Sequence, residues 1–408
     1  IKTDKDGKPD RSKSRIVVLG NHEDRIYEKS KRYAPVLQYS SLRLLVSKAV
    51  GDRRVLQQGD CKNALCNATL PDDERVAVRP PVGDPGFDKD EYWLLKKTLY
   101  GLRRSPRHWY KMFTEILTDM GLTPSAHDPC LFSGVLPSND TSSLDPTSVT
   151  ADICQPTPPR QPLFVGIYVD DFVFYSTDPE EEELFKKRLG EKIVVDFMDD
   201  VDYFLGTAFT WLRHDDGHVS VHMSQTAFTE FTSHRFSVDA MNRVPNMTPY
   251  RSGLPIDSIP PPDPGHPDQS RRTKVFQRLV GCINWLVTCT RLDIAPFITL
   301  LAAYNNGPNA QHYKAATHAL KYLFSTSDYG ISFSSKALST LQAHNHFLHH
   351  HNKEAYNDAT PPSPSESHQL TVFSDACWRG QINNSVPDST PIKIFKLRSL
   401  SGFLICRS

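Results

Sequence analysis

Two adjacent aspartates, Asp170 and Asp171, lie between two apolar runs, residues 163–169 and 172–175. Runs of this length that are rich in β-branched and aromatic residues predict strands, so the segment predicts a β-hairpin with both carboxylates at its turn. Neighbouring carboxylates repel each other and resist removal from water. Any fold of this chain must therefore keep the turn either solvated or close to a cation.

A third aspartate, Asp60, ends another predicted strand, residues 55–60. Mg²⁺ prefers a few hard oxygen ligands while it keeps water or substrate phosphates, and phosphoryl-transfer sites hold two such ions about 4 Å apart. Three carboxylates are enough for a site of this kind. The residues by themselves leave two interpretations open, a metal-dependent phosphoryl-transfer site and a structural turn without chemistry.

The composition fits a globular chain of several subdomains with long insertions. Of 408 residues, 38% are hydrophobic and 23% are charged, and 31 prolines predict a large share of loop. Two segments contain little to bury: residues 135–162 are rich in Pro, Ser, Thr and Asp, and residues 334–368 are rich in His. Imidazoles bind zinc, copper and nickel, but the polar, proline-rich surroundings of the second segment favour a disordered solvated loop.

Charge, hydropathy and cysteine spacing limit the classes of protein and the cellular compartment that fit this chain. The net charge is zero, which by itself gives no indication of a nucleic-acid partner, and no apolar stretch approaches the roughly 20 residues that a membrane span needs. Eight cysteines without a Cys-x-x-Cys pair argue against a disulfide framework and a zinc site, so a reducing, intracellular setting is expected. The first residue is Ile1 and the last residues resemble an unfinished strand, so we expect a fragment of a longer chain.

Basic residues are concentrated in two segments, which predict either a basic groove or two solvated faces. The first holds Lys2, Lys5, Lys8, Arg11, Lys13 and Arg15, and the second holds Lys96, Lys97, Arg103, Arg104, Arg107 and Lys111.

Several helices are predicted from capping residues and apolar periodicity. Ser105 and Pro106 begin a helix whose apolar stripe runs from Trp109 to Met120, and Trp109 is expected in the core rather than at a base-stacking surface. Asp178 and Pro179 begin another helix, whose first-turn glutamates complement the helix dipole.

A strand is predicted at residues 15–19 and a strand pair at 203–212 and 218–223. Helices at residues 276–288, 293–304 and 310–324 predict a separate helical bundle.

The sequence Tyr168-Val169-Asp170-Asp171, in its strand-turn-strand context, is similar to the catalytic motif of reverse transcriptases. Further blocks resemble, in matching order, the polymerase of copia-type LTR retrotransposons. These blocks are residues 13–17, 33–36, 41–45, 58–64, 94–109, 204–206, 279–281 and 290–294. The resemblance extends over roughly residues 1–333.

The resemblance implies an α+β right-hand polymerase with fingers, palm and thumb. Fingers and palm would occupy residues 1–240 and a thumb or connection-like helical region residues 241–333, while residues 369–408 would begin an RNase H-like domain. The implied activity is that of an RNA-directed DNA polymerase, a nucleotidyltransferase that uses an RNA template, a DNA primer and dNTPs. It would act in a cytoplasmic particle or in the nucleus, without a membrane, and its oligomeric state stays open.

The resemblance also assigns roles to individual residues. Asp60, Asp170 and Asp171 would bind two Mg²⁺ ions, or Mn²⁺ in their place. Lys13 and Arg15 would contact the incoming triphosphate, and Tyr100 and Gly101 would line the nucleotide pocket. Nucleic-acid contacts are implied for Tyr168, Arg103, Arg104 and Arg107.

This sequence departs from the family pattern at several positions. Leu65 stands where these enzymes usually carry an aromatic residue that excludes ribonucleotides, and Cys66, Ala68 and Leu292 also differ from the family motif. These departures keep an alternative open, a catalytically silent nucleic-acid-binding relic of such an element.

Near the C-terminus, residues 373–378 resemble the first strand of the family's RNase H domain, and Asp375 would be its leading metal ligand. Residues 398–402 resemble the following strand. The remaining RNase H carboxylates do not occur in these residues, so we expect an incomplete RNase H site without hybrid-cleaving activity.

Overall fold

The computed structural model describes residues 2–3, 9–11, 15–23, 27–81, 83, 90–137, 160–238, 248–250, 268–335, 370–374 and 402–406. Lys13, Asp375, most of the insertion at 135–162 and nearly all of residues 334–368 lie outside the described residues. The chain forms two compact units. Unit 1 comprises Ile1–Leu45 and Leu56–Val201, and unit 2 comprises Val46–Val55 and Asp202–Ser408.

Unit 1 is built on a six-stranded antiparallel sheet with the order β10-β3-β9-β8-β7-β6. Its strands are β3 (Gln57–Cys61), β6 (Thr123–Pro124), β7 (Leu131–Gly134), β8 (Leu163–Tyr168), β9 (Asp171–Ser176) and β10 (Val195–Asp200). β8 and β9 form the predicted hairpin, in which Tyr168 lies opposite Asp171. The prediction of a hairpin with acidic residues at its turn is confirmed.

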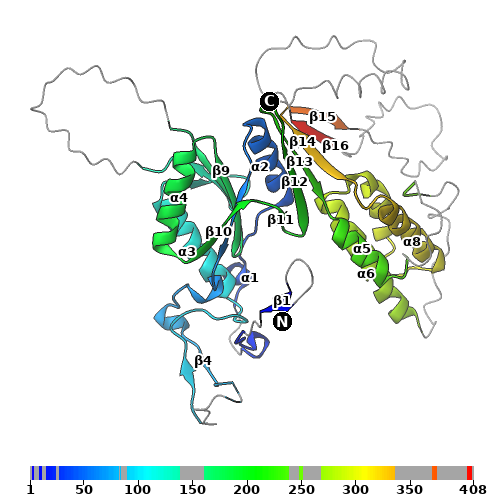
Figure 1. The fold of residues 1–408 in the computed structure, drawn as a ribbon. Coiled ribbons are helices and arrows are strands. Elements are labelled where there is room, and N and C mark those ends of the chain that lie inside the picture. Colours follow the sequence, from blue (N-terminus) through cyan, green and yellow to red (C-terminus); the bar gives the residue numbers. More distant parts are fainter. Residues whose placement is uncertain are drawn as a thin grey trace, which may run out of the picture. The chain divides into compact units, whose positions relative to one another are not determined.

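Two amphipathic helices, α3 (Ser105–Asp119) and α4 (Pro179–Lys192), lie along one side of this sheet (Figure 1). Both pack on Phe172 of β9, whose ring centroid lies 5.8 Å from that of Phe113 and 6.2 Å from that of Phe185. Both helices begin where the sequence predicts. The carboxylate of Asp178 caps α4 by accepting a hydrogen bond from the amide of Glu180.

Two glutamates in the first turn of α4 do more than complement the helix dipole. Glu181 is fully buried and accepts hydrogen bonds from the amide of Leu136 and from Arg160. Glu182 accepts hydrogen bonds from the amide of Ser176 at 2.8 Å and from Gln57 Nε2 at 2.7 Å. These bonds join α4 to β3 and to the end of β9.

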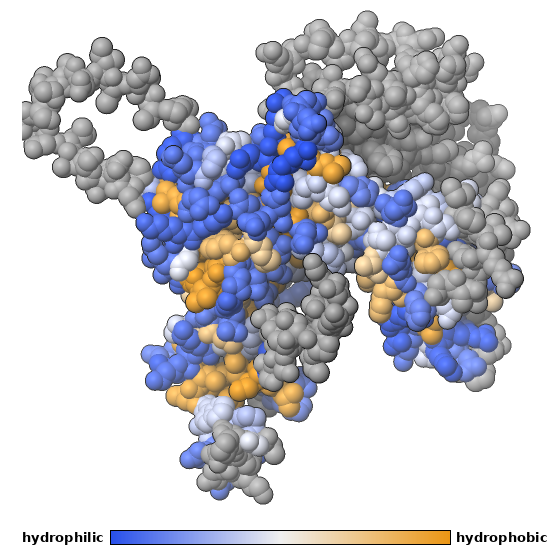
Figure 2. Space-filling model, viewed as in Figure 1, coloured by the Kyte–Doolittle hydropathy of each residue, from blue (hydrophilic) through white to orange (hydrophobic). Residues whose placement is uncertain are grey.

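The remaining elements of unit 1 are short. They are β1 (Lys2–Thr3), β2 (Pro9–Arg11), η1 (Gly20–His22), α1 (Lys29–Arg32), η2 (Ala64–Cys66), η3 (Asp72–Glu74), β4 (Ala77–Val78) and β5 (Trp93–Leu94). Tyr92, Trp93 and Leu94 are exposed, and apolar surface is visible at this end of unit 1 (Figure 2). Helix α2 (Tyr39–Gly51) has its first residues in unit 1 and its last in unit 2, and it buries Leu42, Leu45, Val46 and Ala49, which recur at helical spacing.

Unit 2 contains a four-stranded antiparallel sheet and a group of helices. The sheet has the order β11-β12-β13-β14, formed by Tyr203–Phe204, Thr207–Arg213, Val219–Ser224 and Gly330–Ser334. The helices are α5 (Thr226–Arg235), α6 (Gln269–Cys289), η6 (Leu292–Ile294), α7 (Ala295–Ala302) and α8 (Ala310–Ser325). Helices α6, α7 and α8 share one apolar core, so the predicted helical bundle is confirmed.

Unit 2 differs from the prediction at several elements. The predicted strand 203–212 is interrupted by a turn at Leu205 and Gly206, both with positive φ, so that β11 and β12 pair with each other. Helix α6 begins at Gln269, before the predicted start at Phe276, because its polar first two turns carry no apolar periodicity to indicate a helix. Strand β14, which pairs with β13, lies in a segment without a predicted strand.

Strands β15 (Leu370–Ser374) and β16 (Gly402–Cys406) pair antiparallel, where the sequence predicts strands. No helix in the described part of the chain has the length and apolar character to cross a membrane.

Candidate active site

The fold brings the three predicted aspartates to one place on the sheet of unit 1. Asp60 of β3 lies directly opposite Asp171 of β9, and directly opposed residues of an antiparallel pair project from the same face. Asp170 precedes Asp171 in the turn, and its carbonyl accepts a hydrogen bond from the amide of Cys61 at 2.8 Å. Burial raises the pKa of the Cys61 thiol, and the negative charges of Asp60, Asp170 and Asp171 raise it further. Cys61 is thus close enough to all three carboxylates to be influenced by their charges.

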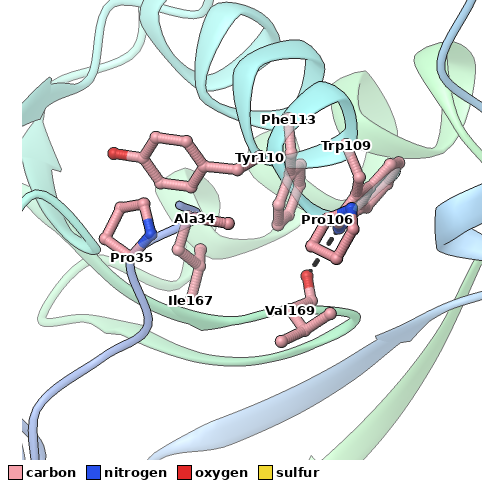
Figure 3. Close-up of a pocket in the computed structure, with 8 residues that line it drawn as sticks. All are labelled: Ala34, Pro35, Pro106, Trp109, Tyr110, Phe113, Ile167 and Val169. Carbon is pink, nitrogen blue, oxygen red and sulfur yellow. Dashed lines mark hydrogen bonds between the residues drawn. The ribbon is translucent and has the colours of Figure 1, made fainter. Parts of the chain in front are cut away.

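The turn between β8 and β9 has an unusual backbone. Val169 adopts φ 59°, in the left-handed region that a β-branched residue rarely enters. Its carbonyl oxygen accepts a hydrogen bond of 2.6 Å from Nε1 of Trp109 (Figure 3). Trp109 is buried, and its ring stacks on Phe113 with 5.2 Å between centroids. The prediction that Trp109 belongs to the core is confirmed, but its hydrogen bond to the turn was not predicted.

Tyr100 lies near two of the aspartates, and Arg15 lies over its ring. The guanidinium carbon of Arg15 lies 4.9 Å from the centroid of the Tyr100 ring, within the range of a cation–π interaction. Burial raises the pKa of Tyr100, the charge of Arg15 opposes this shift, and Asp170 and Asp60 add to it. The Tyr100 phenol therefore lies within electrostatic reach of two of the three carboxylates and of the Arg15 guanidinium.

The loop that carries Tyr100 packs tightly against residues 15–19, which form no strand, contrary to the prediction. The amide of Val18 donates a hydrogen bond of 2.8 Å to the carbonyl of Tyr100. This backbone bond joins residues 15–19 to the loop, whereas a strand would form a regular series of such bonds with a neighbouring strand. Gly101 adopts φ +92°, and a Cβ atom there would lie 2.0 Å from the carbonyl oxygen of Val18. Only glycine fits this conformation and this close approach.

Leu65 and Cys66 lie in η2, directly after β3. The carbonyl of Leu65 accepts a hydrogen bond of 2.6 Å from the buried hydroxyl of Thr98, and the Leu65 side chain is half-buried. Burial raises the pKa of the Cys66 thiol, while a backbone hydrogen bond from Tyr100 and the charge of Arg15 oppose the shift. Cys66 therefore adjoins both Arg15 and Tyr100.

The three arginines predicted to contact nucleic acid all have protein acceptors. Arg103 donates to the carbonyls of Gly20 at 2.6 Å and Asn21 at 3.1 Å, and Arg107 donates to the carbonyl of Tyr33 at 3.0 Å. Arg104 forms an ion pair with Glu74 and lies over the ring of Tyr27. Their contact with nucleic acid stays a prediction.

Known proteins resemble this chain over most of its length. Residues 1–140 match the family described as reverse transcriptase (RNA-dependent DNA polymerase). The retrovirus-related Pol polyprotein from transposon RE2 of Arabidopsis thaliana is 26% identical over 368 residues, 88% of this chain and 21% of that protein. The chain is related to the reverse transcriptases of copia-type retrotransposons.

Two further relatives agree with this assignment. The Pol polyprotein from transposon RE1 of Arabidopsis thaliana is 25% identical over 88% of this chain and 21% of its own length. The Pol polyprotein from transposon TNT 1-94 of Nicotiana tabacum is 23% identical over 80% of this chain and 22% of its own length. The chain thus spans about a fifth of the length of these retrotransposon polyproteins. No solved structure matches it.

The carboxylates of Asp60, Asp170 and Asp171 fit Mg²⁺ in their chemistry, because all three offer hard oxygen donors. Their side chains are not gathered into a finished metal site. Among the described residues, no group of three or more His, Cys, Asp or Glu side chains is arranged to hold a metal ion. Backbone register and the electrostatics at Cys61 are therefore the observations that link the three aspartates.

The structural roles of two further acidic residues were not predicted from the sequence. Asp196 of β10 lies opposite Asp60 on the other side of β3 and forms an ion pair of 2.6 Å with Lys62. The acidic run at residues 196–202 was visible in the sequence, but nothing indicated that one of its members pairs with β3. Glu74 accepts hydrogen bonds from Arg104 and from His108, the latter at 2.8 Å. Burial acts to raise the pKa of Glu74, but these two partners lower it below its ordinary value.

Proposed function

We propose that this chain is the polymerase part of an RNA-directed DNA polymerase, which extends a DNA primer on an RNA template by nucleotidyl transfer from dNTPs. One observation carries the proposal: Asp60 lies opposite Asp171, beside the turn that holds Asp170, and Tyr100 lies within electrostatic reach of Asp60 and Asp170. The relationship to retrotransposon Pol polyproteins supports the same activity. In this proposal residues 1–240 act as fingers and palm and residues 241–333 as the thumb.

Asp60, Asp170 and Asp171 would hold two Mg²⁺ ions, with Mn²⁺ as a possible substitute. When bound, such ions supply positive charge to the attacking primer oxygen and to the departing pyrophosphate. The aspartates bring three negative charges to a half-buried surface, so a divalent cation would relieve their mutual repulsion. This relief supports a functional cation site over a purely structural turn.

The triphosphate would be bound by Arg15, whose guanidinium offers several donors in a planar arrangement that matches phosphate oxygens. Lys13 is proposed to assist from the same segment. Tyr100 and Gly101 would line the nucleotide pocket, since Tyr100 lies within electrostatic reach of both Arg15 and Asp60. The charge of the bound substrate would then lie between the cation of Arg15 and the metal-binding aspartates.

Leu65 would face the sugar of the incoming nucleotide. The bond from Thr98 to the Leu65 carbonyl fixes the backbone there, so the side chain at position 65 decides how much space the 2′-position has. Leucine is smaller and more flexible than an aromatic ring. We therefore expect weak discrimination against ribonucleotides and stronger discrimination in a Leu65→Phe variant.

Tyr168, Arg103, Arg104 and Arg107 are proposed to contact the nucleic-acid strands. The arginines would have to exchange their backbone or carboxylate acceptors for phosphate oxygens, which offer comparable hydrogen bonds. Asp375 is proposed as the first ligand of an incomplete RNase H site.

Primer extension tests the proposal directly. Purified chain is incubated with a poly(rA) template, an oligo(dT) primer, dTTP and Mg²⁺, and compared with an Asp170→Asn, Asp171→Asn variant. Extension should be lost in this variant and retained in Asp199→Asn, which changes an exposed carboxylate of the same sheet. A parallel reaction with rUTP measures sugar discrimination by the wild type and by Leu65→Phe.

The alternative is a nucleic-acid-binding relic without catalysis, which Leu65 and the absence of a gathered metal cluster among the described residues favour. Wild-type chain that binds the primer–template but does not extend it, with Mg²⁺ or Mn²⁺, would establish the relic and exclude the polymerase.

A further inference from the structure

The turn that carries Asp170 depends on a residue outside the group of aspartates. Val169 occupies the left-handed region at φ 59°, and such a conformation persists in a β-branched residue only when the surroundings enforce it. Two hydrogen bonds hold the two turn residues: Cys61 donates its amide to the carbonyl of Asp170 at 2.8 Å, and Trp109 donates Nε1 to the carbonyl of Val169 at 2.6 Å. The second bond acts on the strained residue itself.

Trp109 is rigidly held. It lies on α3, is 1% exposed, and stacks on Phe113 with an interplanar angle of 19°. Pro106 stands in the first turn of the same helix and lines a small pocket beside the Val169 carbonyl (Figure 3). The indole N–H therefore has a fixed direction, and it points at the turn.

Among the described residues that line this pocket, none other than Trp109 offers a donor to the Val169 carbonyl. Ala34, Pro35, Phe113 and Ile167, which line the same pocket, carry no polar side-chain atoms. The hydroxyl of Tyr110, which also lines it, donates to the carbonyl of Pro129 at 3.1 Å. Removing the indole N–H would leave a carbonyl in apolar surroundings and release the restraint on Val169.

We propose that Trp109 is a positioning residue of the polymerase, whose indole N–H keeps Val169 left-handed so that Asp170 and Asp171 project beside Asp60. Trp109 acts through the backbone of the turn and touches neither metal nor substrate. The expected effect of Trp109 on kcat rests on the proposed polymerase function. Its effect on the backbone of the turn can be measured without any enzymatic activity.

The test compares substitutions at two core positions of α3. Trp109→Phe removes the donor and keeps an aromatic ring, whereas Leu117→Ala truncates a fully buried side chain two turns further along the helix and leaves Trp109 and Phe113 unchanged. If Trp109→Phe does not fold, β-(3-benzothienyl)alanine at position 109 replaces the N–H by sulfur at nearly constant shape. Urea unfolding of each variant establishes how much stability it loses.

Trp109→Phe should lower kcat about tenfold, the rate equivalent of one lost buried hydrogen bond, with the KM for dTTP unchanged. Leu117→Ala should lose stability without this selective loss of kcat. The same Trp109 substitution in a Val169→Asn background should cost less, because asparagine enters the left-handed region more readily than valine. An equal loss of kcat in both backgrounds, or none in either, would overturn the proposal.

Hydrogen exchange followed by mass spectrometry gives an independent measurement. Peptides that cover residues 166–173 should exchange faster in Trp109→Phe and at the wild-type rate in Leu117→Ala. Unchanged exchange in Trp109→Phe would overturn the inference even in an active enzyme. If the wild-type chain does not extend primers, the proposed function fails, and the exchange data still decide whether Trp109 holds the turn.

Discussion

Asp60 and Asp171 lie directly opposite each other in the antiparallel pairing of β3 with β9. Like charges in directly opposed positions destabilise a sheet, and here the turn adds Asp170 next to them. The chain therefore carries a local electrostatic cost at the position where the proposed chemistry requires concentrated negative charge. This relationship predicts that activity and stability respond in opposite directions when one of the charges is removed.

Asp60→Asn should raise the free energy of unfolding in metal-free buffer by about 0.5 kcal/mol, because it removes one member of a like-charge pair. The same variant should lose primer extension. Urea unfolding in the presence of a chelator measures the first effect. Added Mg²⁺ should stabilise the wild type and have little effect on Asp60→Asn, since a ligand stabilises only the state that binds it. A variant less stable than the wild type without metal would contradict this account.

Gly101→Ala should destabilise unit 1 by about 2 kcal/mol or more, because a residue with a Cβ atom is strained at positive φ. The new Cβ would also lie 2.0 Å from the carbonyl oxygen of Val18, so the segment that carries Arg15 must move. We expect the KM for dTTP to rise as well. Thermal unfolding and steady-state kinetics measure the two effects.

Gly190→Ala is the matched control in the same unit. Gly190 lies within α4, and no atom lies within 4 Å of an added Cβ. The substitution should stabilise the chain by about 0.5–1 kcal/mol, the helix-propensity difference between glycine and alanine. Similar losses in both variants would refute the special role of Gly101.

Glu74→Gln should lower the free energy of unfolding by about 2 kcal/mol, since it removes charged hydrogen bonds to Arg104 and His108. All three side chains are largely buried, with 14%, 16% and 11% of the side-chain surface exposed for Glu74, Arg104 and His108. Glu183→Gln serves as the control, because Glu183 is 72% exposed and its pair with Lys186 lies on the surface. Surface pairs contribute at most about 1 kcal/mol, so the control should be close to wild type.

Asp293 should make the stability of unit 2 dependent on acidic pH. Burial acts to raise its pKa, but hydrogen bonds from Arg291 and Tyr322 and the charge of Arg291 lower it below the ordinary value. A lowered pKa in the folded state contributes stability above the unfolded pKa of about 3.9 and loses it as the pH falls through the folded value. The difference in unfolding free energy between wild type and Asp293→Asn should therefore shrink below about pH 4. A difference that is constant from neutral to acidic pH would disprove the prediction.

The sequence determined the local elements whose signals lie within a few residues. The apolar runs around Asp170 and Asp171 predicted the β8–β9 hairpin, and Ser105, Pro106 and the stripe from Trp109 onward predicted α3. The ordered motifs also indicated the retrotransposon Pol polyproteins to which the chain is similar. Strand 15–19 was predicted wrongly, because its apolar residues, including exposed Ile16 and Val17, lie along the loop at Gly101 without a strand partner.

Tertiary structure alone decided which distant residues meet. The register of β3 against β9 sets Asp60 opposite Asp171, and a shift of one residue would turn one of these side chains to the other face. Likewise, the packing of α3 directs the Trp109 indole to Val169, and the position of η3 gives Arg104 an acidic partner in Glu74. Periodicity and capping act over one or two turns of chain. Strand register and side-chain partners depend on how segments far apart in the sequence pack together.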